Sequence, residues 1–296
     1  MRVGIAGTGR MGTAIARRLL DLKHSVVVWN RSPQPALALR EAGAQVAATP
    51  RELAACVGVV ISMLTDEAAL DAVYFGADGL LAAPLSKLLC IDMSTVRPAW
   101  PQAAGARVQD AGGRFVECPV GGSIGPAREG RLLGFAGGAA EDVQQARELL
   151  SLLCRRVEHV GPLGAGSTVK LAINLPLMVY WQTLSEALSL LQPLGLDPAR
   201  VIDLLSETSG GPNMLKVRGA TIAQALAGQP APQVSVDVAT MRKDLRAMLD
   251  QAASQRRRLP LTALALQTFE QAAAAGLDGA DCTQLPVWWL GDAGRS

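Results

Sequence analysis

Six residues near the N-terminus, Gly7-Thr8-Gly9-Arg10-Met11-Gly12, have the GxGxxG spacing of a dinucleotide-binding turn. They follow an apolar stretch, Val3–Ala6, and precede a stretch rich in Ala, Arg and Leu. In such a turn the first glycine allows a tight bend and the second lets the backbone approach a pyrophosphate, while the third lets the helix pack on the strand. The N–H groups at the start of the helix then bind the phosphates. We therefore predict a nucleotide site here; a glycine-rich turn without a ligand is the alternative.

The end of the next apolar stretch, Asn30-Arg31-Ser32, indicates which dinucleotide binds. Sites for NAD(H) place an acidic residue there to hold the ribose 2′-hydroxyl. An arginine can instead bind a 2′-phosphate through paired hydrogen bonds, and a serine can add a hydroxyl. The sequence thus favours NADP(H) over NAD(H). The alternative is that Arg31 is a solvated residue at the start of the next helix.

Hydride transfer to a carbonyl needs a proton donor beside the new oxygen, and the reverse reaction needs a base. The two histidines, His24 and His159, lie in no recognisable motif. Lysine is rare, since the 28 basic residues comprise five lysines and 23 arginines. A lysine can exchange protons near neutral pH when burial or a neighbouring cation lowers its pKa. Lys170 is the best placed, with Asn174 one helical turn later; a surface lysine is the alternative.

Three polar segments follow apolar stretches and are expected at the carboxyl ends of strands, where Rossmann-type folds bind ligands. They are Ser62–Asp66, Asp92–Thr95 and Pro119–Gly125. The third is rich in glycine, and its N–H groups could hold a carboxylate. A flexible connection is the alternative for that segment.

The elements that must position these residues alternate in the first half of the chain, which predicts a parallel sheet with helical crossovers. Expected strands are Val3–Ala6, Ser25–Trp29, Val57–Leu64, Leu88–Asp92 and Arg114–Glu117, and expected helices are Met11–Leu22 and Gln34–Ala42. Later residues are helical, starting with a long helix over Ser167–Leu194 and broken near Gly195–Pro198, Gly210–Pro212 and Gly228–Pro232. The predicted fold is α/β: a doubly wound Rossmann domain, 1–162, and an all-helical substrate and dimerisation domain, 163–296, joined by that helix.

Composition excludes several classes of protein. The net charge is only +2, which argues against nucleic-acid binding. No apolar run approaches the about 20 residues of a membrane span, and the N-terminus lacks the pattern of a signal peptide. The five cysteines are scattered, which indicates a reducing compartment without disulfides or a metal site. We expect a cytoplasmic protein.

These motifs, in this order, resemble those of the β-hydroxyacid dehydrogenases, over nearly the whole chain. The matching segments are Val3–Gly12, Asp92–Pro98 (DxSTxxP), Pro119–Leu132, Gly164–Asn174 (GxGxxxKxxxN) and Lys243-Asp244-Leu245. The resemblance implies an oxidoreductase that transfers a hydride between NADP(H) and a small β-hydroxyacid, aldehyde or keto acid. It also implies a homodimer or homotetramer, with a substrate that bears a carboxylate.

The resemblance further implies roles for single residues. Lys170 would be the general acid in reduction and the base in oxidation, and Asn174 would hold the substrate and order that lysine. The cofactor would be contacted by Leu64, Thr65, Thr95 and Lys243. The substrate would be contacted by Thr95, Gly121, Gly122 and Ser123. Asp244 would support Lys243 beside the substrate.

Some positions depart from the family pattern and leave alternatives open. The substrate loop reads Gly121-Gly122-Ser123 where SGG is common, and Arg97 stands where small residues are common and could add a cation near the site. An imine reductase-like enzyme on the same fold is one alternative, although imine reductases generally replace the lysine. A non-catalytic NADP-binding regulatory protein is another, and it would be expected to lose Lys170.

Overall fold

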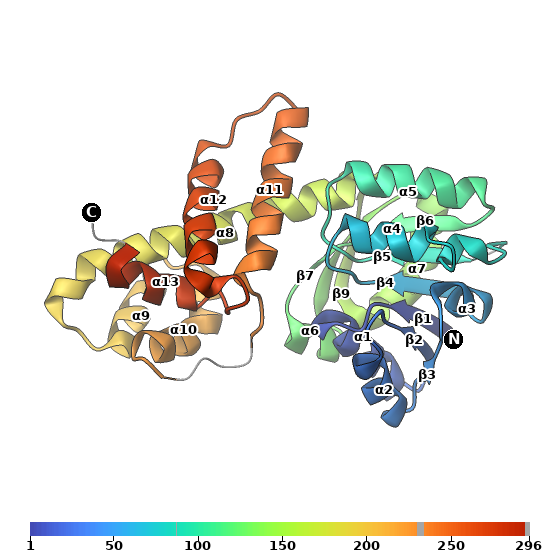
Figure 1. Cartoon of the computed structure of the whole chain (residues 1–296), viewed down its shortest axis with the longest axis horizontal. Helices are drawn as coiled ribbons and strands as arrows, with labels where there is room; N and C mark the ends of the chain where they lie inside the picture. The colour runs from blue at the N-terminus through green and yellow to red at the C-terminus, as the bar shows by residue number, and fades with distance from the viewer. Residues whose placement is uncertain (87, 230–233, 294–296) are drawn as a thin grey trace. The chain divides into compact units, whose positions relative to one another are not determined.

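The structure is a computed structural model that describes residues 1–86, 88–229 and 234–293 (Figure 1). It divides into two compact units, Met1–Leu171 and Ala172–Ser296. The division falls inside the long helix, whereas the sequence pattern placed the domain boundary at 162/163. Among the described residues, no helix combines the length and the apolar character that crossing a membrane requires.

The first unit is built on a nine-stranded sheet whose order is β3-β2-β1-β4-β5-β6-β8-β7, with β9 paired to β8. Five consecutive pairings, from β3 to β6, are parallel. The strands are β1 (Arg2–Ala6), β2 (Ser25–Trp29), β3 (Gln45–Val46), β4 (Val59–Ser62), β5 (Leu89–Asp92), β6 (Arg114–Glu117), β7 (Val120–Gly121), β8 (Leu132–Gly137) and β9 (Cys154–Gly161). The chain moves outward from β1 in both directions, and this reversal creates the ligand-binding crevice of a Rossmann fold.

Helices cover both faces of this sheet, with α1 and α2 on one side and α4 and α5 on the other (Figure 1). Alternate residues of each central strand enter different cores: Val26 and Val28 of β2 join one apolar cluster, and Val27 joins the other. Burial on both faces explains why β2 is an uninterrupted apolar run. The helices are α1 (Arg10–Asp21), α2 (Pro33–Glu41), α3 (Pro50–Ala55), α4 (Glu67–Phe75), η1 (Leu80–Ala82), α5 (Ala99–Asp110), α6 (Ile124–Glu129) and α7 (Ala140–Leu153).

The doubly wound fold predicted from the sequence is confirmed, and the sequence pattern missed four strands. Strands β3 and β7 have two residues each, which is too short for a periodic signal. Strand β8 contains two glycines, and β9 carries charged residues along its exposed side. Strand β8 runs antiparallel to β6 and β7. The sheet therefore ends in a mixed edge rather than in a purely parallel one.

The second unit is helical over its described residues. The helices are α8 (Ala165–Leu191), η2 (Gln192–Leu194), α9 (Pro198–Ser206), α10 (Asn213–Leu226), α11 (Val238–Ser254), α12 (Pro260–Ala272), η3 (Ala273–Leu277), α13 (Gln284–Trp288) and η4 (Trp289–Ala293), and α8 begins in the first unit. Helix α8 starts two residues before the predicted Ser167 and continues past Pro176. The expected break at Gly228–Pro232 lies partly outside the described residues.

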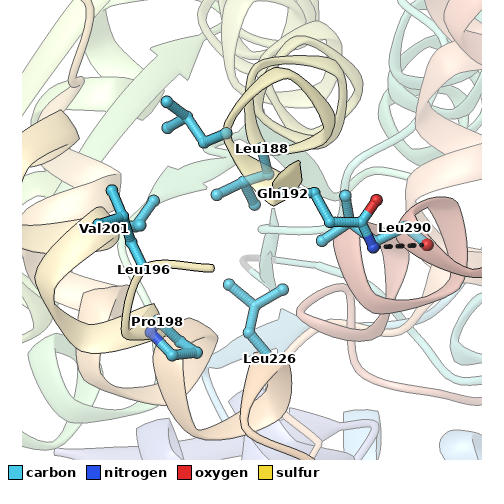
Figure 2. Close-up of a pocket in the computed structure, with 8 residues that line it drawn as sticks. Leu188, Gln192, Leu196, Pro198, Val201, Leu226 and Leu290 are labelled. Atoms are coloured by element: carbon cyan, nitrogen blue, oxygen red, sulfur yellow. Dashed lines mark hydrogen bonds between the residues drawn. The ribbon is translucent and has the colours of Figure 1, made fainter. Parts of the chain in front are cut away.

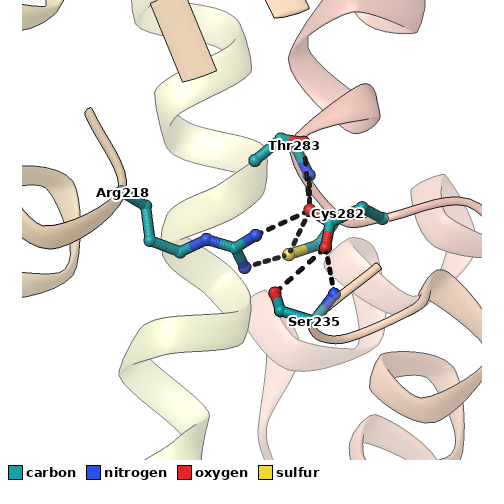
Figure 3. Close-up of polar contacts among 5 residues, drawn as sticks. Arg218, Ser235, Cys282 and Thr283 are labelled. Carbon is teal, nitrogen blue, oxygen red and sulfur yellow. Dashed lines mark hydrogen bonds and ion pairs between the residues drawn. The ribbon is translucent and has the colours of Figure 1, made fainter. Parts of the chain in front are cut away.

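A buried carboxylate ties three segments of the second unit together (Figure 3). Asp281 accepts hydrogen bonds from Arg218 of α10 at 2.7 Å, from the backbone N–H of Ser235 at 2.7 Å and from that of Thr283 at 3.0 Å. Arg218 also donates to the buried Sγ of Cys282 at 2.9 Å. Burial alone would raise the pKa of Asp281, but the bonds from Thr283 and Ser235 and the charge of Arg218 lower it to about 2. The carboxylate is therefore ionised and held by the fold.

Candidate active site

The glycines of the dinucleotide turn are required by the geometry of the first unit. Gly7 has φ +98°, a conformation that favours glycine, and a Cβ at this position would overlap the backbone of Met63. A Cβ on Gly12 would overlap the carbonyl oxygen of Gly7, so only glycine lets α1 start this close to β1. Around Gly9, by contrast, a Cβ would meet no atom of the protein within 4 Å. Gly7 and Gly12 thus serve packing, while Gly9 faces open space.

The open space at Gly9 lies at the N-terminus of α1, where Gly9 is the N-cap residue and makes no side-chain cap. The N–H groups of a helix N-terminus and the helix dipole favour an anion there. The turn is held from the neighbouring strand end, because the N–H of Thr8 donates to Oδ1 of Asn30 at 2.9 Å. Oδ1 of Asn30 is thereby engaged with the loop, and its Nδ2 donates to the carbonyl of Ser32 at 2.8 Å. These residues fit the pyrophosphate of a dinucleotide.

Arg31 and Ser32 follow β2 and are exposed. The hydrogen bond from the side-chain amide of Asn30 to the carbonyl of Ser32 orders this segment beside the dinucleotide turn. Ser32 is the N-cap residue of α2 without capping the helix through its side chain. The arrangement presents a guanidinium and a hydroxyl at the position where an acidic residue would hold a ribose 2′-hydroxyl.

A buried hydrogen-bond network connects the carboxyl ends of β4 and β5. The carboxylate of Asp92, which is 1% exposed, accepts from Ser62 Oγ at 2.7 Å and from Ser94 Oγ at 2.8 Å. The single hydroxyl proton of Ser62 is donated to Asp92. The hydroxyl of Tyr74 is therefore the donor in the 2.9 Å contact with Ser62 Oγ. Burial, the Cys90 thiol and Asp92 raise the pKa of Tyr74, which keeps the phenol protonated.

This network positions two segments that the sequence assigned to the cofactor. Ser94 Oγ accepts the N–H of Leu64 at 2.9 Å, so the loop after β4 is joined to the loop after β5. Thr65 comes directly after Leu64, and Thr95 directly after Ser94. The sequence identified Asp92 and Ser94 only as part of a motif. The signal in the sequence for the supporting role of Asp92 was an acidic residue at the end of an apolar strand.

The predicted substrate loop lies beyond the edge of the parallel sheet. Glu117, Val120 and Gly121 pair in one register with Gly137, Gly134 and Leu133 of β8. The segment from β6 through β7 thus forms one extended antiparallel ladder with β8, which is interrupted at Cys118 and Pro119. The predicted substrate loop follows at the end of this ladder. Gly122 has φ +126°, and both Gly122 and Ser123 are exposed. The backbone of Gly122 thus adopts a conformation that favours glycine, in an exposed part of the loop.

Lys170 lies in the second turn of α8, in the same unit as the dinucleotide turn. The N-terminus of this helix is bound to Glu117, a residue 1% exposed at the end of β6. Its Oε1 accepts the N–H of Gly166 at 3.0 Å, and its Oε2 accepts the N–H of Ser167 at 3.0 Å. Burial raises the pKa of Glu117 above its ordinary value, and these hydrogen bonds oppose that shift. Sequence analysis assigned no function to Glu117.

In the second unit, the predicted residues Asn174, Lys243 and Asp244 come together. The Nδ2 of Asn174 donates to Oδ2 of Asp244 at 3.4 Å, and Nζ of Lys243 lies 3.0 Å from Oδ1 of Asp244. Since the carboxylate is 4% exposed and only accepts, it fixes which end of the Asn174 amide faces it. Asp244 therefore orients an amide that stands one turn after Lys170 on α8.

Arg97, expected from the sequence to add a cation near the site, is bound by Glu67 at the start of α4. Its Nε donates to Oε1 of Glu67 at 2.8 Å, and its backbone N–H donates to the same oxygen at 3.1 Å. The paired geometry neutralises the guanidinium and joins the loop after β5 to α4. Arg97 therefore supports the Thr95 loop rather than supplying an unpaired positive charge.

An apolar pocket of about 190 Å³ lies in the second unit, and Asn174, Lys243 and Asp244 are not among the residues that line it (Figure 2). Its walls come from the end of α8, from α9, from α10 and from η4. Gln192 closes one side by donating to the carbonyl of Leu290 at 3.2 Å. The lining residues are Leu188, Leu191, Gln192, Leu196, Pro198, Val201, Leu226 and Leu290. Apart from Gln192 they are aliphatic, so the pocket carries no group suited to proton transfer.

Comparison with known proteins matches both halves of the chain. The family model described as the NAD binding domain of 6-phosphogluconate dehydrogenase matches residues 2–161. The model described as NAD-binding of NADP-dependent 3-hydroxyisobutyrate dehydrogenase matches residues 164–288. The 3-hydroxyisobutyrate dehydrogenase of Pseudomonas aeruginosa is 34% identical, with 92% of each chain covered. The L-threonate dehydrogenase of Cupriavidus necator is 31% identical over 94% of this chain and 93% of its own.

Solved structures agree with this assignment. The 3-hydroxyisobutyrate dehydrogenase of Salmonella typhimurium superposes with a TM-score of 0.88 at 26% identity, over 97% of this chain and 99% of that one. Psf3, solved with NADP+ and 2-OPP, superposes with a TM-score of 0.85 at 28% identity and the same coverage. An imine reductase of Streptomyces aurantiacus, with a TM-score of 0.62 and 24% identity over 98% of this chain and 99% of its own, shares the fold.

The fold and the dinucleotide turn define an NAD(P)-binding oxidoreductase with a Rossmann domain and a helical C-terminal domain. Within that class, the chain belongs to the β-hydroxyacid dehydrogenase family.

Proposed function

We propose that this protein transfers a hydride between NADP(H) and a small β-hydroxyacid or the corresponding aldehyde or keto acid, with Lys170 as general acid and base. The observation that carries the proposal is the placement of Lys170 on α8. It stands in the same unit as the dinucleotide turn and one turn before Asn174, an amide held by Asp244. This combination supplies a proton donor and an oriented hydrogen-bonding group on one helix.

Bound NADP(H) would supply or accept the hydride at the substrate carbon. In reduction, Lys170 would give a proton to the oxygen as it becomes a hydroxyl; in oxidation, it would remove that proton. Asn174 would hydrogen-bond the substrate and keep the lysine in place. Thr95 would lie beside both cofactor and substrate, and Lys243 would contact the cofactor with Asp244 in support.

The proposed substrate class is supported by two observations. The exposed loop Gly121-Gly122-Ser123 has a positive φ at Gly122, and Ser123 makes no side-chain cap to α6. Its backbone N–H groups and hydroxyl suit a carboxylate. The names of the two relatives, 3-hydroxyisobutyrate dehydrogenase and L-threonate dehydrogenase, are those of enzymes for hydroxyacids. Both observations support a small substrate that bears a carboxylate.

The proposed preference for NADP(H) rests on Arg31 and Ser32. Both are exposed after β2, and no acidic residue stands at this strand end to repel a 2′-phosphate. The dinucleotide turn itself, including Thr8, Arg10 and Met11, would bind the pyrophosphate common to both cofactors. Leu64 and Thr65, held by Ser94, would contact the cofactor from the β4 end.

We also propose a homodimer or homotetramer in the cytoplasm. Seven large apolar side chains of the second unit are exposed: Ile173, Leu190, Leu194, Leu204, Val217, Leu261 and Leu264. Association of subunits through this unit would bury some of these side chains. The five free, dispersed cysteines fit a reducing compartment. Light scattering on the eluting protein would measure the mass of the assembly, and a monomer would refute this part.

The test of the function is oxidation of NADPH by the purified protein, with NADH alongside. The substrates would be succinic semialdehyde, glyoxylate, tartronate semialdehyde and a cyclic imine, each repeated with Lys170→Ala and with the control Lys216→Ala, whose lysine pairs with Glu207 on the surface. Turnover of a semialdehyde or keto acid that is abolished only in Lys170→Ala supports the proposal. Turnover of the imine alone, unchanged in Lys170→Ala, would refute it and favour an imine reductase. Binding of NADPH without turnover of any compound would favour a regulatory protein.

A further inference from the structure

The carboxylate of Glu117 receives four hydrogen bonds from the first turn of α8 and from Gly164, the residue before it. Oε1 accepts the backbone N–H groups of Gly164 and Gly166, the latter at 3.0 Å. Oε2 accepts the backbone N–H of Ser167 at 3.0 Å and its hydroxyl at 2.5 Å. Glu117 lies about fifty residues earlier in the chain, at the end of β6. The cap of this helix is thus supplied by the sheet rather than by a neighbouring residue.

All four N–H groups that a helix start leaves without an intrahelical partner are bound here, three of them by Glu117. Gly164, Gly166 and Ser167 donate to Glu117, and Ala165 donates to the carbonyl of Pro162 at 3.0 Å. The first intrahelical bond runs from Thr168 to the carbonyl of Gly164 at 3.0 Å. Because both carboxylate oxygens are engaged, the rotation and the axial position of the first turn are fixed together.

The glycines around this cap allow the approach. Gly164 has φ +94°, and a Cβ on Gly166 would overlap the carbonyl oxygen of Phe135 and lie 3.2 Å from the carboxyl carbon of Glu117. A Cβ on Gly137, the β8 partner of Glu117, would overlap the carboxylate itself. The second glycine of the GxG that precedes Lys170 is therefore required by the close approach of α8 to Phe135 and Glu117. It lets α8 start directly against a buried acid on the sheet.

We propose that Glu117 is a positioning residue for Lys170. Lys170 follows Gly166 by four residues and Ser167 by three, so it lies on the helix face that Glu117 holds, one turn further on. A rotation or slide of the first turn would be passed directly to the lysine. Proton transfer depends steeply on such placement, since a misplacement of about 1 Å can cost roughly 100-fold in rate. The inference rests on the proposed role of Lys170 as acid and base.

The test compares Glu117→Gln with the matched control Glu148→Gln, which changes an exposed glutamate on α7 of the same unit. Glutamine keeps the shape of the side chain but replaces one acceptor oxygen by an NH2 donor. This donor would face either the N–H groups of Gly164 and Gly166 or the N–H and hydroxyl of Ser167, which are donors themselves. Three quantities are measured: kcat and KM with the best substrate, the Kd for NADPH, and the 13Cε signal of Lys170 in protein labelled at lysine. With only five lysines in the chain, Lys170→Arg assigns that signal.

We expect kcat of Glu117→Gln to fall roughly 10- to 100-fold while KM and the NADPH Kd stay within about two-fold. The Lys170 signal should move, and those of Lys23 and Lys216 should not. The control should change none of these. An unmoved Lys170 signal, or an unchanged kcat, in the folded variant would overturn the proposal. So would a parallel loss of NADPH affinity, which would indicate a general loss of structure.

A milder variant keeps the proposal testable if Glu117→Gln fails to fold. Ser167→Ala removes only the hydroxyl bond to Oε2 and should shift the Lys170 signal in the same direction by a smaller amount; no shift would count against the proposal. The lysine spectrum needs no substrate. If the wild type turns over no compound, the proposed function fails while the spectrum still decides whether Glu117 positions Lys170.

Discussion

Asp92 and Glu117 occupy partner positions on the neighbouring parallel strands β5 and β6, and both carboxylates are 1% exposed. Each is surrounded by hydrogen-bond donors from a different part of the site. Asp92 binds Ser62 and Ser94, and Glu117 binds the start of α8. The carboxyl edge of the sheet thus holds the loops after β4 and β5, and the start of the helix that carries Lys170, through two adjacent buried acids.

Replacing Asp92 by alanine should destabilise the first unit by roughly 2–4 kcal/mol, because the hydroxyls of Ser62 and Ser94 lose a charged acceptor in a buried place. The midpoint of urea unfolding measures the change. The affinity for NADPH should fall as well, since Ser94 holds the N–H of Leu64. The control Asp110→Ala, at the exposed end of α5, should alter neither. Unchanged stability in Asp92→Ala would show that the network is dispensable.

The two roles of the glycines can be separated. Gly9→Ala should fold normally, because its Cβ meets no protein atom within 4 Å, yet bind NADPH more than about ten-fold more weakly, because the methyl group fills the space for the pyrophosphate. Gly12→Ala should lose both stability and binding through the overlap with Gly7. Gly58→Ala, also in open space, is the control. Fluorescence titration with NADPH measures the affinities, and full affinity in Gly9→Ala would contradict the assignment of this turn.

The choice of cofactor should depend on Arg31. Arg31→Gln should weaken NADPH binding roughly 10- to 100-fold and leave NADH binding nearly unchanged, because a charge-assisted hydrogen bond to a phosphate is worth about 1.5–3 kcal/mol. Arg40→Gln, an exposed arginine of the following helix α2, serves as the control. The ratio of the two Kd values is the readout. Equal losses for both cofactors would mean that Arg31 does not read the 2′-phosphate.

The second unit should lose stability in acid through Asp281. Its pKa of about 2 in the folded protein lies below the value of about 3.9 expected in the unfolded chain. A depressed carboxyl pKa stabilises the fold above the unfolded value, and this contribution disappears as the pH falls from about 4 toward 2. Thermal unfolding across this range should show the loss. Asp281→Asn should be less stable near neutral pH and should lack this part of the pH dependence.

The matched comparison is Asp203→Asn, which changes an exposed residue of α9 and should keep the wild-type pH profile. If Asp281→Asn retains the full acid-induced loss, other carboxyl groups cause it.

Local patterns in the sequence determined a large part of this protein. The strands Ser25–Trp29 and Arg114–Glu117 have the predicted bounds, because a run buried on both faces is apolar without interruption and ends at polar residues. The dinucleotide turn could be predicted because two of its requirements are local: Gly7 has φ +98°, and a Cβ on Gly12 would overlap the carbonyl oxygen of Gly7. The long helix was predicted from an extended stretch of residues with a helical pattern, and its predicted start lies two residues after the observed one.

Tertiary structure decided which polar residues cooperate. The bonds from Ser167 to Glu117 and from Asn174 to Asp244 join positions 50 and 70 residues apart, and no local periodicity encodes such pairs. The antiparallel strand β8 was missed for the same reason, since its glycines are explained only by the close approach of Cys118 and Glu117. Patterns of burial are visible in the sequence because they repeat within one or two turns of a helix or a few residues of a strand. The hydrogen-bond donors of a buried carboxylate can come from any segment that the fold places beside it.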